Sequence, residues 1–598
     1  MNGRGAKTLN KLFSPLAEAI PGPHLDPMTI PKLEKLIQAA RGEIPADLVF
    51  KGGKVINVFS SEIQETDVAV CEDTIVGLGS YEGLETIDCR NRFISPGFID
   101  GHLHIESTLL TPSRLTPVLL LHGTTTVVAD PHEIANVFGL KGIDFMLADS
   151  EGLPLEMYFM APSCVPATHL ETAGAALSAE DLSSLGQHPR ILGLGEMMNF
   201  PGVLFRDREV LKKITAFSQK VKDGHAPLLS GKDLNAYLTA GIRSDHETLM
   251  LSEAREKLSL GMVLMIREGS TAKNLQDLLP LVSSANARRC LLVTDDRHPG
   301  DLWEEGHLDY LLKQAIALGL NPFTAIQMVT LNPAEYFGLR HLGAVAPGYQ
   351  ADLVILKSLQ ALEVEGVIKK GKWVVQNGCL PEERPHTDQG LKGRKMQIKD
   401  LTLEKFIIPV QGEWAQVIEL IPDQILTKKI RHKVRTENGR VVLSQEEDIV
   451  FLACVERHKG TGLVGLGLVK GLGLKQGALA SSVAHDSHNI VVAGRDPGDM
   501  LLAVQTIENM VGGLVVVVRG EVKAALPLPI AGLMSDQSIE HVLEQKKALL
   551  QAVPLTGCGL SNPFMPLSFL ALPVIPELKI TDKGLVDVNR FEIIPLME

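Results

Sequence analysis

The chain has 598 residues, enough for several domains, and its 45% hydrophobic and 22% charged residues are ordinary for a globular protein. The formal net charge of −13 and the lack of a broad basic stripe argue against nucleic acid as the partner. No run approaches the roughly 18 apolar residues of a membrane span, so we expect no membrane partner either.

The cysteines form no C-x-x-C pair, and their number, seven, is odd. Such usage is typical of reduced thiols in the cytoplasm rather than of a disulfide framework or a zinc ribbon. The first 24 residues include basic side chains but no apolar core like that of a signal peptide. We therefore expect a cytoplasmic protein.

The N-terminal part, residues 1–92, contains two kinds of sequence pattern. Residues 1–45 have a helical, solvated pattern that Pro21, Pro23 and Pro27 interrupt. Short β-like runs follow at 47–50, 54–58, 67–70 and 74–78, separated by glycines. This pattern predicts the first part of a small β domain.

From residue 93 to about residue 339, short apolar runs alternate with helix-length amphipathic segments such as 207–222 and 304–318. This alternation is typical of βα units around a parallel sheet. Eight strands are predicted to end near His104, Asp130, Ser163, Glu196, His225, His246, Glu268 and Asp295. Eight units in this length predict a (β/α)8 barrel, a fold of about 250 residues.

After the barrel, residues 340–380 are β-like again and are predicted to return to the small β domain, which would then be composite. Residues 380–394 are polar and contain glycine and proline, which suggests a linker. Residues 395–598 are predicted to form a C-terminal α+β domain. It would contain a hairpin turn at Asn438-Gly439, a strand at 515–518, and helices from Asp496 to Met510 and from 536 to 553.

Chemistry-bearing side chains follow the barrel strands. In the string GHLHIES, residues two apart in a strand face the same way, so His102 and His104 project together. Because a barrel builds its site at the carboxyl ends of its strands, these histidines are expected to meet the polar residues that end strands four, five, six and eight. The resulting candidate ligands are His102, His104, Glu196, His225, His246 and Asp295.

Four imidazoles and two carboxylates would serve two divalent cations, with Glu196 as the bridge. A water shared by such a pair has its pKa lowered toward about 7, which supplies hydroxide at neutral pH. Asp295 is placed to take that water's proton, although spacing alone does not separate it from Asp296. Taken singly, His225 could be a loop residue and His246 a solvated helix start.

Long strings in the chain resemble the amidohydrolase superfamily and, within it, the bacterial adenine deaminases. The strings are SPGFIDGHLHIEST, VVADPHEIANVFG, GLGEMMNFPGV, DGHAP, SDHE, MIREGS, VTDDRHPGDL, GYQADLV and VAHDSHNIVVAGRD. The resemblance implies the same six metal ligands, with Glu196 in the place where many members have a carboxylated lysine.

The resemblance also implies an activity: hydrolysis of adenine to hypoxanthine and ammonia, with a metal-bridging hydroxide attacking C6 and Asp295 moving the proton. It favours Mn²⁺ or Fe²⁺, with Zn²⁺ as an alternative that the ligands do not exclude. The expected partner is a small-molecule purine base, and we expect a homo-oligomer, a dimer in the first instance. The H-x-E with P-C-x-x-C signature of the zinc nucleoside deaminases is absent.

Three further clusters are candidates for substrate binding. Asp130, His132 and Glu133 end strand two and could orient substrate or support the metal ligands from behind, although Asp130 could instead cap a helix that begins at Pro131. Arg267, Glu268 and Ser270 end strand seven and could equally lie in an exposed loop. In the C-terminal region His485, Asp486 and His488 could reach over the barrel mouth, or form a polar turn between strands.

Two other functions compete with this interpretation. Another binuclear amidohydrolase, acting on a cyclic amide or an N-acyl group, would use the same ligands, and a substrate screen separates it from a purine deaminase. A scaffold without catalysis is disfavoured because all six candidate ligands are present.

Overall fold

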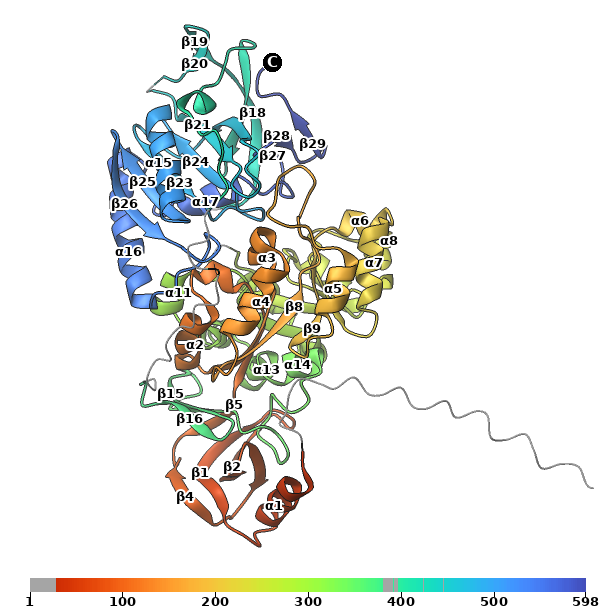
Figure 1. Ribbon diagram of the computed structural model, residues 1–598. Helices are drawn as coiled ribbons and strands as arrows, with labels where there is room; N and C mark the ends of the chain where they lie inside the picture. The colour runs from red at the N-terminus through yellow and green to blue at the C-terminus, as the bar shows by residue number, and fades with distance from the viewer. Residues whose placement is uncertain (1–27, 271, 380–390, 392–395, 423, 445) are drawn as a thin grey trace, which may run out of the picture.

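The computed structural model describes residues 28–379 (without 271), residue 391 and residues 396–598 (without 423 and 445). The predicted features of residues 1–27 and almost all of the predicted linker lie outside the described residues. Figure 1 shows a small β domain and a C-terminal domain at opposite ends of a central α/β body. No helix of the described part combines the length and the apolarity needed to cross a bilayer.

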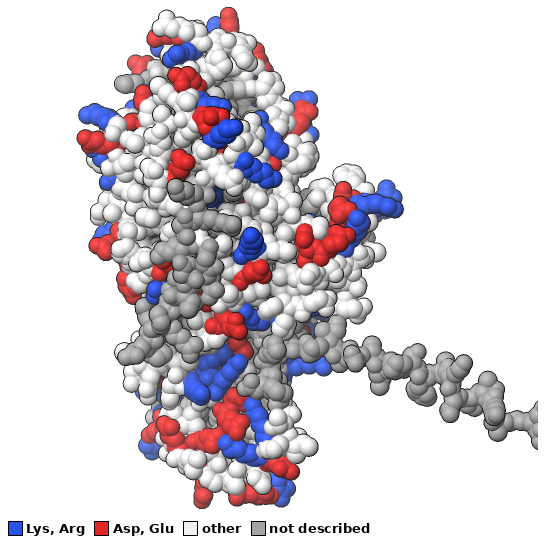
Figure 2. All heavy atoms as spheres, in the orientation of Figure 1, with Lys and Arg blue, Asp and Glu red and all other residues white. Residues whose placement is uncertain are grey.

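On the face drawn in Figure 2, basic and acidic side chains are interspersed rather than gathered into one broad basic area.

The small β domain is composite. Its sheet has the order β16-β15-β14-β5-β1-β2-β3, with β4 also paired to β1. The first part supplies β1 (Ala46–Asn57), β2 (Glu62–Cys71), β3 (Thr74–Leu78), β4 (Gly83–Asp88) and β5 (Phe93–Pro96), beside helix α1 (Ile30–Ala40). The returning part supplies β14 (Leu353–Leu356), β15 (Val364–Lys369) and β16 (Lys372–Gln376). The predicted boundary at residue 93 falls inside this sheet, because β5 pairs with β1 and β14.

The central body contains the eight parallel strands of the predicted barrel. They are β6 (Phe98–Leu103), β7 (Thr124–Ala129), β8 (Glu156–Ala161), β9 (Ile191–Met197), β10 (Val221–Gly224), β11 (Ser244–Asp245), β12 (Val263–Arg267) and β13 (Cys290–Val293). They form one run from β6 to β10 and another from β11 to β13. Hydrogen bonds from Arg243 N to Lys222 O (3.1 Å) and from Asp295 N to His102 O (3.0 Å) link the two runs at both seams.

Helices lie between successive strands, as the alternation predicts. They include α2 (Pro112–Leu121), α4 (Leu140–Asp149), α8 (Gly231–Thr239), α9 (Leu251–Ser259) and α14 (Leu331–Phe337). Two predicted helices were too long. The segment 207–222 is α7 (Arg208–Ala216), because its end already forms β10, and the segment 304–318 is split between α11 (Pro299–Glu304) and α12 (Leu308–Ala317) around Gly306, whose φ is +114°.

The C-terminal domain is built on a sheet with the order β18-β17-β22-β21-β24-β23-β25-β26. Its members are β17 (Trp414–Leu420), β18 (Thr427–Lys433), β21 (Ile449–Val455), β22 (Val464–Lys470), β23 (Ala478–Ser481), β24 (Ile490–Gly494), β25 (Gly513–Val518) and β26 (Glu521–Pro527). The predicted hairpin is present as β19 (Arg435–Glu437) and β20 (Arg440–Val442). A Cβ at Gly465 would lie 1.9 Å from the carbonyl oxygen of Thr581, so close packing explains a glycine there.

The helices of this domain also match the prediction. Helix α15 (Pro497–Asn509) begins after Asp496, whose side chain accepts from Gly498 N and Asp499 N, and α16 (Ile539–Ala552) replaces the predicted 536–553. The loop between β23 and β24 faces the barrel. Asn489 Nδ2 donates to Thr172 O at 2.8 Å, and Arg114 Nε donates to Asp536 O at 2.8 Å, so the two bodies are joined by polar contacts near the strand ends.

Candidate metal centre

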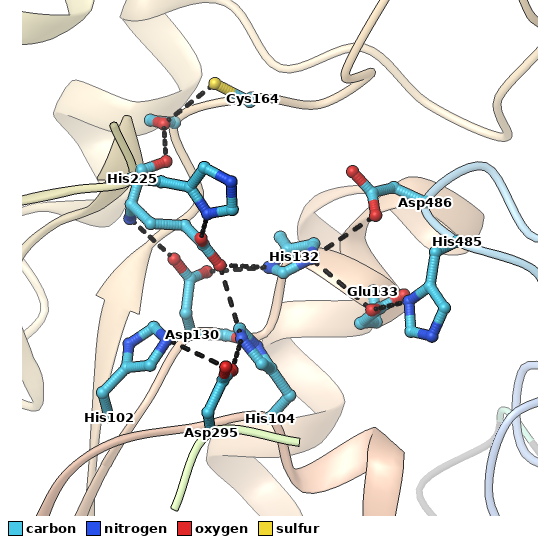
Figure 3. A network of polar contacts seen from close by, with 12 residues as sticks. His102, His104, Asp130, His132, Glu133, Cys164, His225, Asp295, His485 and Asp486 are labelled. Carbon is cyan, nitrogen blue, oxygen red and sulfur yellow. Dashed lines mark hydrogen bonds and ion pairs between the residues drawn. The ribbon is translucent and has the colours of Figure 1, made fainter. Parts of the chain in front are cut away.

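The six predicted ligands converge. Glu196, at the end of β9, lies in the middle of them: its Oε1 is 3.3 Å from His104 Nε2, and its Oε2 is 2.7 Å from His225 Nδ1 and 3.2 Å from His246 Nε2. Figure 3 shows His102, His104, His225 and Asp295 pointing toward one region from different strand ends. One carboxylate therefore faces two separate sets of imidazoles with its two oxygens.

Asp295, just after β13, completes the group. Its Oδ1 is 3.2 Å from His104 Nε2 and 3.6 Å from His102 Nε2, and the rings of His102 and His246 stack with centroids 4.1 Å apart. Donor atoms close enough to share one cation occur in the groups His102–His104–Glu196 and Glu196–His225–His246, which have Glu196 in common. The geometry fits two neighbouring cations joined by a shared carboxylate.

The orientation of two rings supports metal binding. His104 Nδ1 is 3.0 Å from the carbonyl oxygen of Asp130, so Nδ1 carries the proton and Nε2 offers a lone pair to the centre. A metal-binding imidazole usually donates its other N–H in this way. His102 Nε2 is buried and has no hydrogen-bond partner among the described residues, which is costly unless a ligand occupies that side.

Asp130 also fixes the position of Glu196. Its Oδ2 accepts the backbone N–H of Glu196 at 2.9 Å, and a Cβ on Gly195 would lie 2.1 Å from the same oxygen. Gly195, the second glycine of the GLGE string, is therefore needed for this contact. His132 Nδ1 lies 3.4 Å from Glu196 Oε1, so His132 reaches the edge of the centre. Asp130 supports Glu196 from the other side, through its backbone N–H.

A buried arginine lies behind Asp295. Arg267, at the end of β12, donates from Nη1 to Asp295 Oδ2 at 2.5 Å and from Nη2 to Glu247 Oε2 at 2.8 Å. Burial alone would raise the pKa of the Asp295 carboxyl, but Arg267, followed by His102 and His104, outweighs it and holds that pKa well below its usual range. The backbone of Asp295 is left-handed, with φ +57°, an uncommon conformation for this residue type.

The C-terminal domain contributes its own side chains to this region. Glu133, at the start of α3 (His132–Phe138), accepts from His485 Nδ1 at 2.6 Å and also contacts His488 Nε2. His488 Nδ1 lies 3.1 Å from Ala484 N and accepts its proton, so the proton of the neutral ring is on Nε2 and faces Glu133. This tautomer makes His488 a donor to Glu133 rather than a metal ligand.

The pKa values of the two histidines that contact Glu133 shift in opposite directions. For His485, burial lowers the pKa but the Glu133 carboxylate raises it more, to about 9, whereas burial dominates for His488 and lowers its pKa to about 4. The His485 ring stacks on Phe569 with centroids 4.7 Å apart. Asp486 Oδ1 is 4.0 Å from His132 Nε2, so this loop approaches the centre through His132 and Glu133 (Figure 3).

The two candidates after β12 have other partners. Glu268 Oε2 accepts from Leu275 N at 3.4 Å, and the Ser270 hydroxyl contacts Asp301 and accepts from His298 N at 2.7 Å. Neither side chain has a hydrogen bond or ion pair with the six ligands in the described part of the chain. Ser270 stays near the centre only through its backbone N–H, which donates to Asp296 O at 2.8 Å.

Of the residues that hold the site together, Glu247 was not a candidate from the sequence. Arg267 and Glu133 were candidates for substrate binding, but nothing in their spacing shows what they face. Glu106 was also missed: it is buried, its Oε1 accepts from Ile134 N at 3.0 Å, and burial followed by the Glu133 charge raises its pKa to about 7.

The chain is similar to known proteins over most of its length. The Amidohydrolase family profile matches residues 93–374, and the Adenine deaminase C-terminal domain profile matches residues 424–592. An adenine deaminase of Desulfatibacillum aliphaticivorans is 50% identical over 573 residues, covering 94% of this chain and 100% of the relative. "Adenine deaminase 2" of Carboxydothermus hydrogenoformans is 50% identical over 566 residues, covering 94% and 99%.

Among solved structures, a β-aspartyl dipeptidase of Fervidobacterium islandicum AW-1 is 18% identical, with a TM-score of 0.43, and the match covers 56% of this chain and 99% of the other. The likeness to the curated relatives spans both the barrel and the C-terminal domain at high identity. The chain belongs to the adenine deaminase family of the amidohydrolases.

Proposed function

We propose that this chain hydrolyses adenine to hypoxanthine and ammonia at a pair of divalent cations. The observation that carries the proposal is the position of Glu196, whose two oxygens face His104 on one side and His225 with His246 on the other. The relatives match this chain over almost their whole length and are named adenine deaminases. This similarity favours adenine over a cyclic amide or an N-acyl compound as the substrate.

In this proposal His102, His104 and Asp295 hold one cation, His225 and His246 hold the other, and Glu196 bridges them. When bound, the two ions would lower the pKa of a water molecule and so supply a nucleophile at neutral pH. Imidazole and carboxylate ligands suit Mn²⁺ and Fe²⁺, which we propose as the resident ions, with Zn²⁺ as the alternative.

Asp295 is the proposed proton carrier. The overall reaction adds water across the C6–N1 bond of the purine and then breaks the bond from C6 to the amino group. One proton of the water must end on N1 and the other on the departing amine, so a neighbouring group must take up a proton and pass it on. The Asp295 carboxylate, kept ionised by Arg267, can accept that proton and return it. Asp296 is a weaker candidate because its carboxylate is engaged by Ser107.

Recognition of the purine is proposed for the residues around the centre. His132, beside Glu196, and His485 with Asp486, on the C-terminal loop, border the region that a planar base would enter. Asp130 and His488 contribute by fixing Glu196 and Glu133. Glu268 and Ser270, whose side chains have partners elsewhere, would take part only from the rim.

We also propose a cytoplasmic enzyme that works as a homodimer. All seven cysteines are free thiols, which fits a reducing compartment. Light scattering after gel filtration measures the assembly directly, and a monomer at micromolar concentration would remove the dimer from the proposal.

The test compares Asp295→Asn with Asp296→Asn. An amide cannot carry the proton, so Asp295→Asn should retain most of its metal and release ammonia from adenine at least about 100-fold more slowly, within the range of general acid–base effects. Asp296→Asn should lose much less activity. Substantial turnover in Asp295→Asn would move the role elsewhere, and hydrolytic ring opening of dihydropyrimidines without ammonia release from adenine would overturn the substrate.

A further inference from the structure

A pocket of about 440 Å³ opens at the end of the barrel opposite the candidate metal centre. It lies where β10, β11, β12 and β13 begin, whereas the metal-centre residues lie where the strands end. Its lining residues are Lys220, Val221, Lys222, Gly241, Arg243, Gly261, Arg289 and Tyr336. Four of these eight are basic and none is acidic, in a chain whose net charge is −13.

Among the residues that the structure describes, no carboxylate forms an ion pair with the basic side chains of this pocket. Lys220 Nζ donates to the carbonyl oxygens of Gly186 and Ile191 at 2.7 and 2.6 Å, and Lys222 Nζ donates to Phe217 O at 3.0 Å. Within the described residues, the guanidinium groups of Arg243 and Arg289 make no hydrogen bond or ion pair. Both arginines are exposed and can turn toward the pocket.

This arrangement costs free energy unless a counter-charge is present. Burial lowers the pKa of the Lys222 ammonium, and the nearby Arg243 lowers it further, which is the effect of like charges without an intervening anion. Two guanidinium groups present forked donors that match the oxygens of a phosphate, and an ammonium adds a compact charge. A Cβ on Gly261 would meet no atom within 4 Å, so the pocket is open at this residue, whereas the Lys222 side chain lies against Gly241.

We propose that this pocket binds a phosphate-bearing small molecule through Arg243, Arg289 and Lys222. The shape favours a small ligand over a polymer, because the basic groups gather in one hollow instead of spreading along a stripe. Its volume lies in the range of small-molecule sites, about 300–1,000 Å³, and leaves room for more than a phosphate alone. The site is separate from the proposed deaminase chemistry and does not depend on it.

The test is calorimetric titration of the metal-loaded protein in phosphate-free buffer with inorganic phosphate, pyrophosphate and ribose 5-phosphate. The variant is Arg243→Gln/Arg289→Gln. The matched control is Arg255→Gln/Arg288→Gln, which removes the same charge from two exposed arginines of α9 and the turn before β13 that do not line the pocket. All four positions are exposed, so both double variants should fold.

Wild type and control should bind at least one of the three probes at one saturable site, and the pocket variant should bind it at least about tenfold more weakly, since two charge-assisted contacts are lost. Tighter binding of ribose 5-phosphate than of inorganic phosphate would identify an organic ester as the ligand; the reverse would identify a free anion. No saturable binding of any probe, or equal binding by the pocket variant, as expected for an anion held at the metal centre, would overturn the proposal.

Discussion

Replacing Arg267 with glutamine tests how Asp295 is held. The Arg267 side chain is about 6% exposed and contacts two carboxylates, Asp295 and Glu247. Glutamine keeps a hydrogen-bond donor but removes the charge, so both buried carboxylates lose their cation. The pKa of Asp295 should rise, and its carboxylate should no longer be fixed on one side.

The magnitude follows from the contacts that are lost. A hydrogen bond to a charged group contributes about 1.5–3 kcal/mol, which corresponds to a loss of about 10- to 150-fold in kcat if it falls on the position of Asp295. Breaking a buried ion pair also costs about 3–5 kcal/mol of stability. At about 2–4 °C per kcal/mol for a body of this size, Tm should fall by about 6–20 °C.

The assay is ammonia release from adenine together with thermal unfolding. Arg297→Gln is the control, because Arg297 is also buried and pairs with Glu305 at 2.8 Å but touches none of the six candidate ligands. It should lose stability without a comparable loss of turnover. Equal turnover in Arg267→Gln and Arg297→Gln would refute the role given to Arg267.

Three further predictions concern the supports of the site and of the fold. His488→Ala deprives the buried Glu133 carboxylate of a donor and should lower the free energy of unfolding by about 3 kcal/mol in urea titrations; a change near zero would contradict the contact between the domains. Asp130→Asn should weaken metal affinity by about 10- to 100-fold in chelator competition, as loss of a residue behind a ligand does, and unchanged affinity would count against its supporting role. Burial raises the pKa of Glu156, but Lys369 outweighs it and lowers that pKa from 4.5 to about 2, so Glu156→Gln should be less stable than wild type at pH 7. A lowered carboxyl pKa stabilises the fold fully above the unfolded pKa, and this stabilisation is lost as the pH falls toward the folded pKa. The difference in Tm should therefore shrink as the pH falls from about 4.5 toward about 2, and a difference independent of pH would contradict the ion pair.

The barrel and its strand ends were predictable because their signals are local. An apolar run that stops at an acid or a histidine, as at Glu196 and His104, marks both the strand and the side chain that leaves it. Strand β11, with two residues, was still located because His246 follows it. The end of α7 was missed since Val221 continues an apolar pattern that suits either helix or strand.

The contacts that support the site were not predictable because they join residues that lie far apart in the sequence. Glu133 meets His485, 352 residues further along the chain, and no local pattern pairs them. Arg267 reads as the end of a strand, yet its function in the fold comes from Glu247 and Asp295, which two other loops supply. The packing of the C-terminal domain on the barrel decides the contact of Glu133, and the order of the barrel strands in space decides those of Arg267.

We propose above that side chains from five strand ends bind a pair of cations, and that adenine is deaminated at this pair. Metal analysis and ammonia release on the same preparation test it most directly. We expect two divalent ions per chain, loss of hypoxanthine and ammonia production after chelation, and recovery when two equivalents of Mn²⁺ or Fe²⁺ are returned. Undiminished turnover of adenine by the metal-free protein would contradict it.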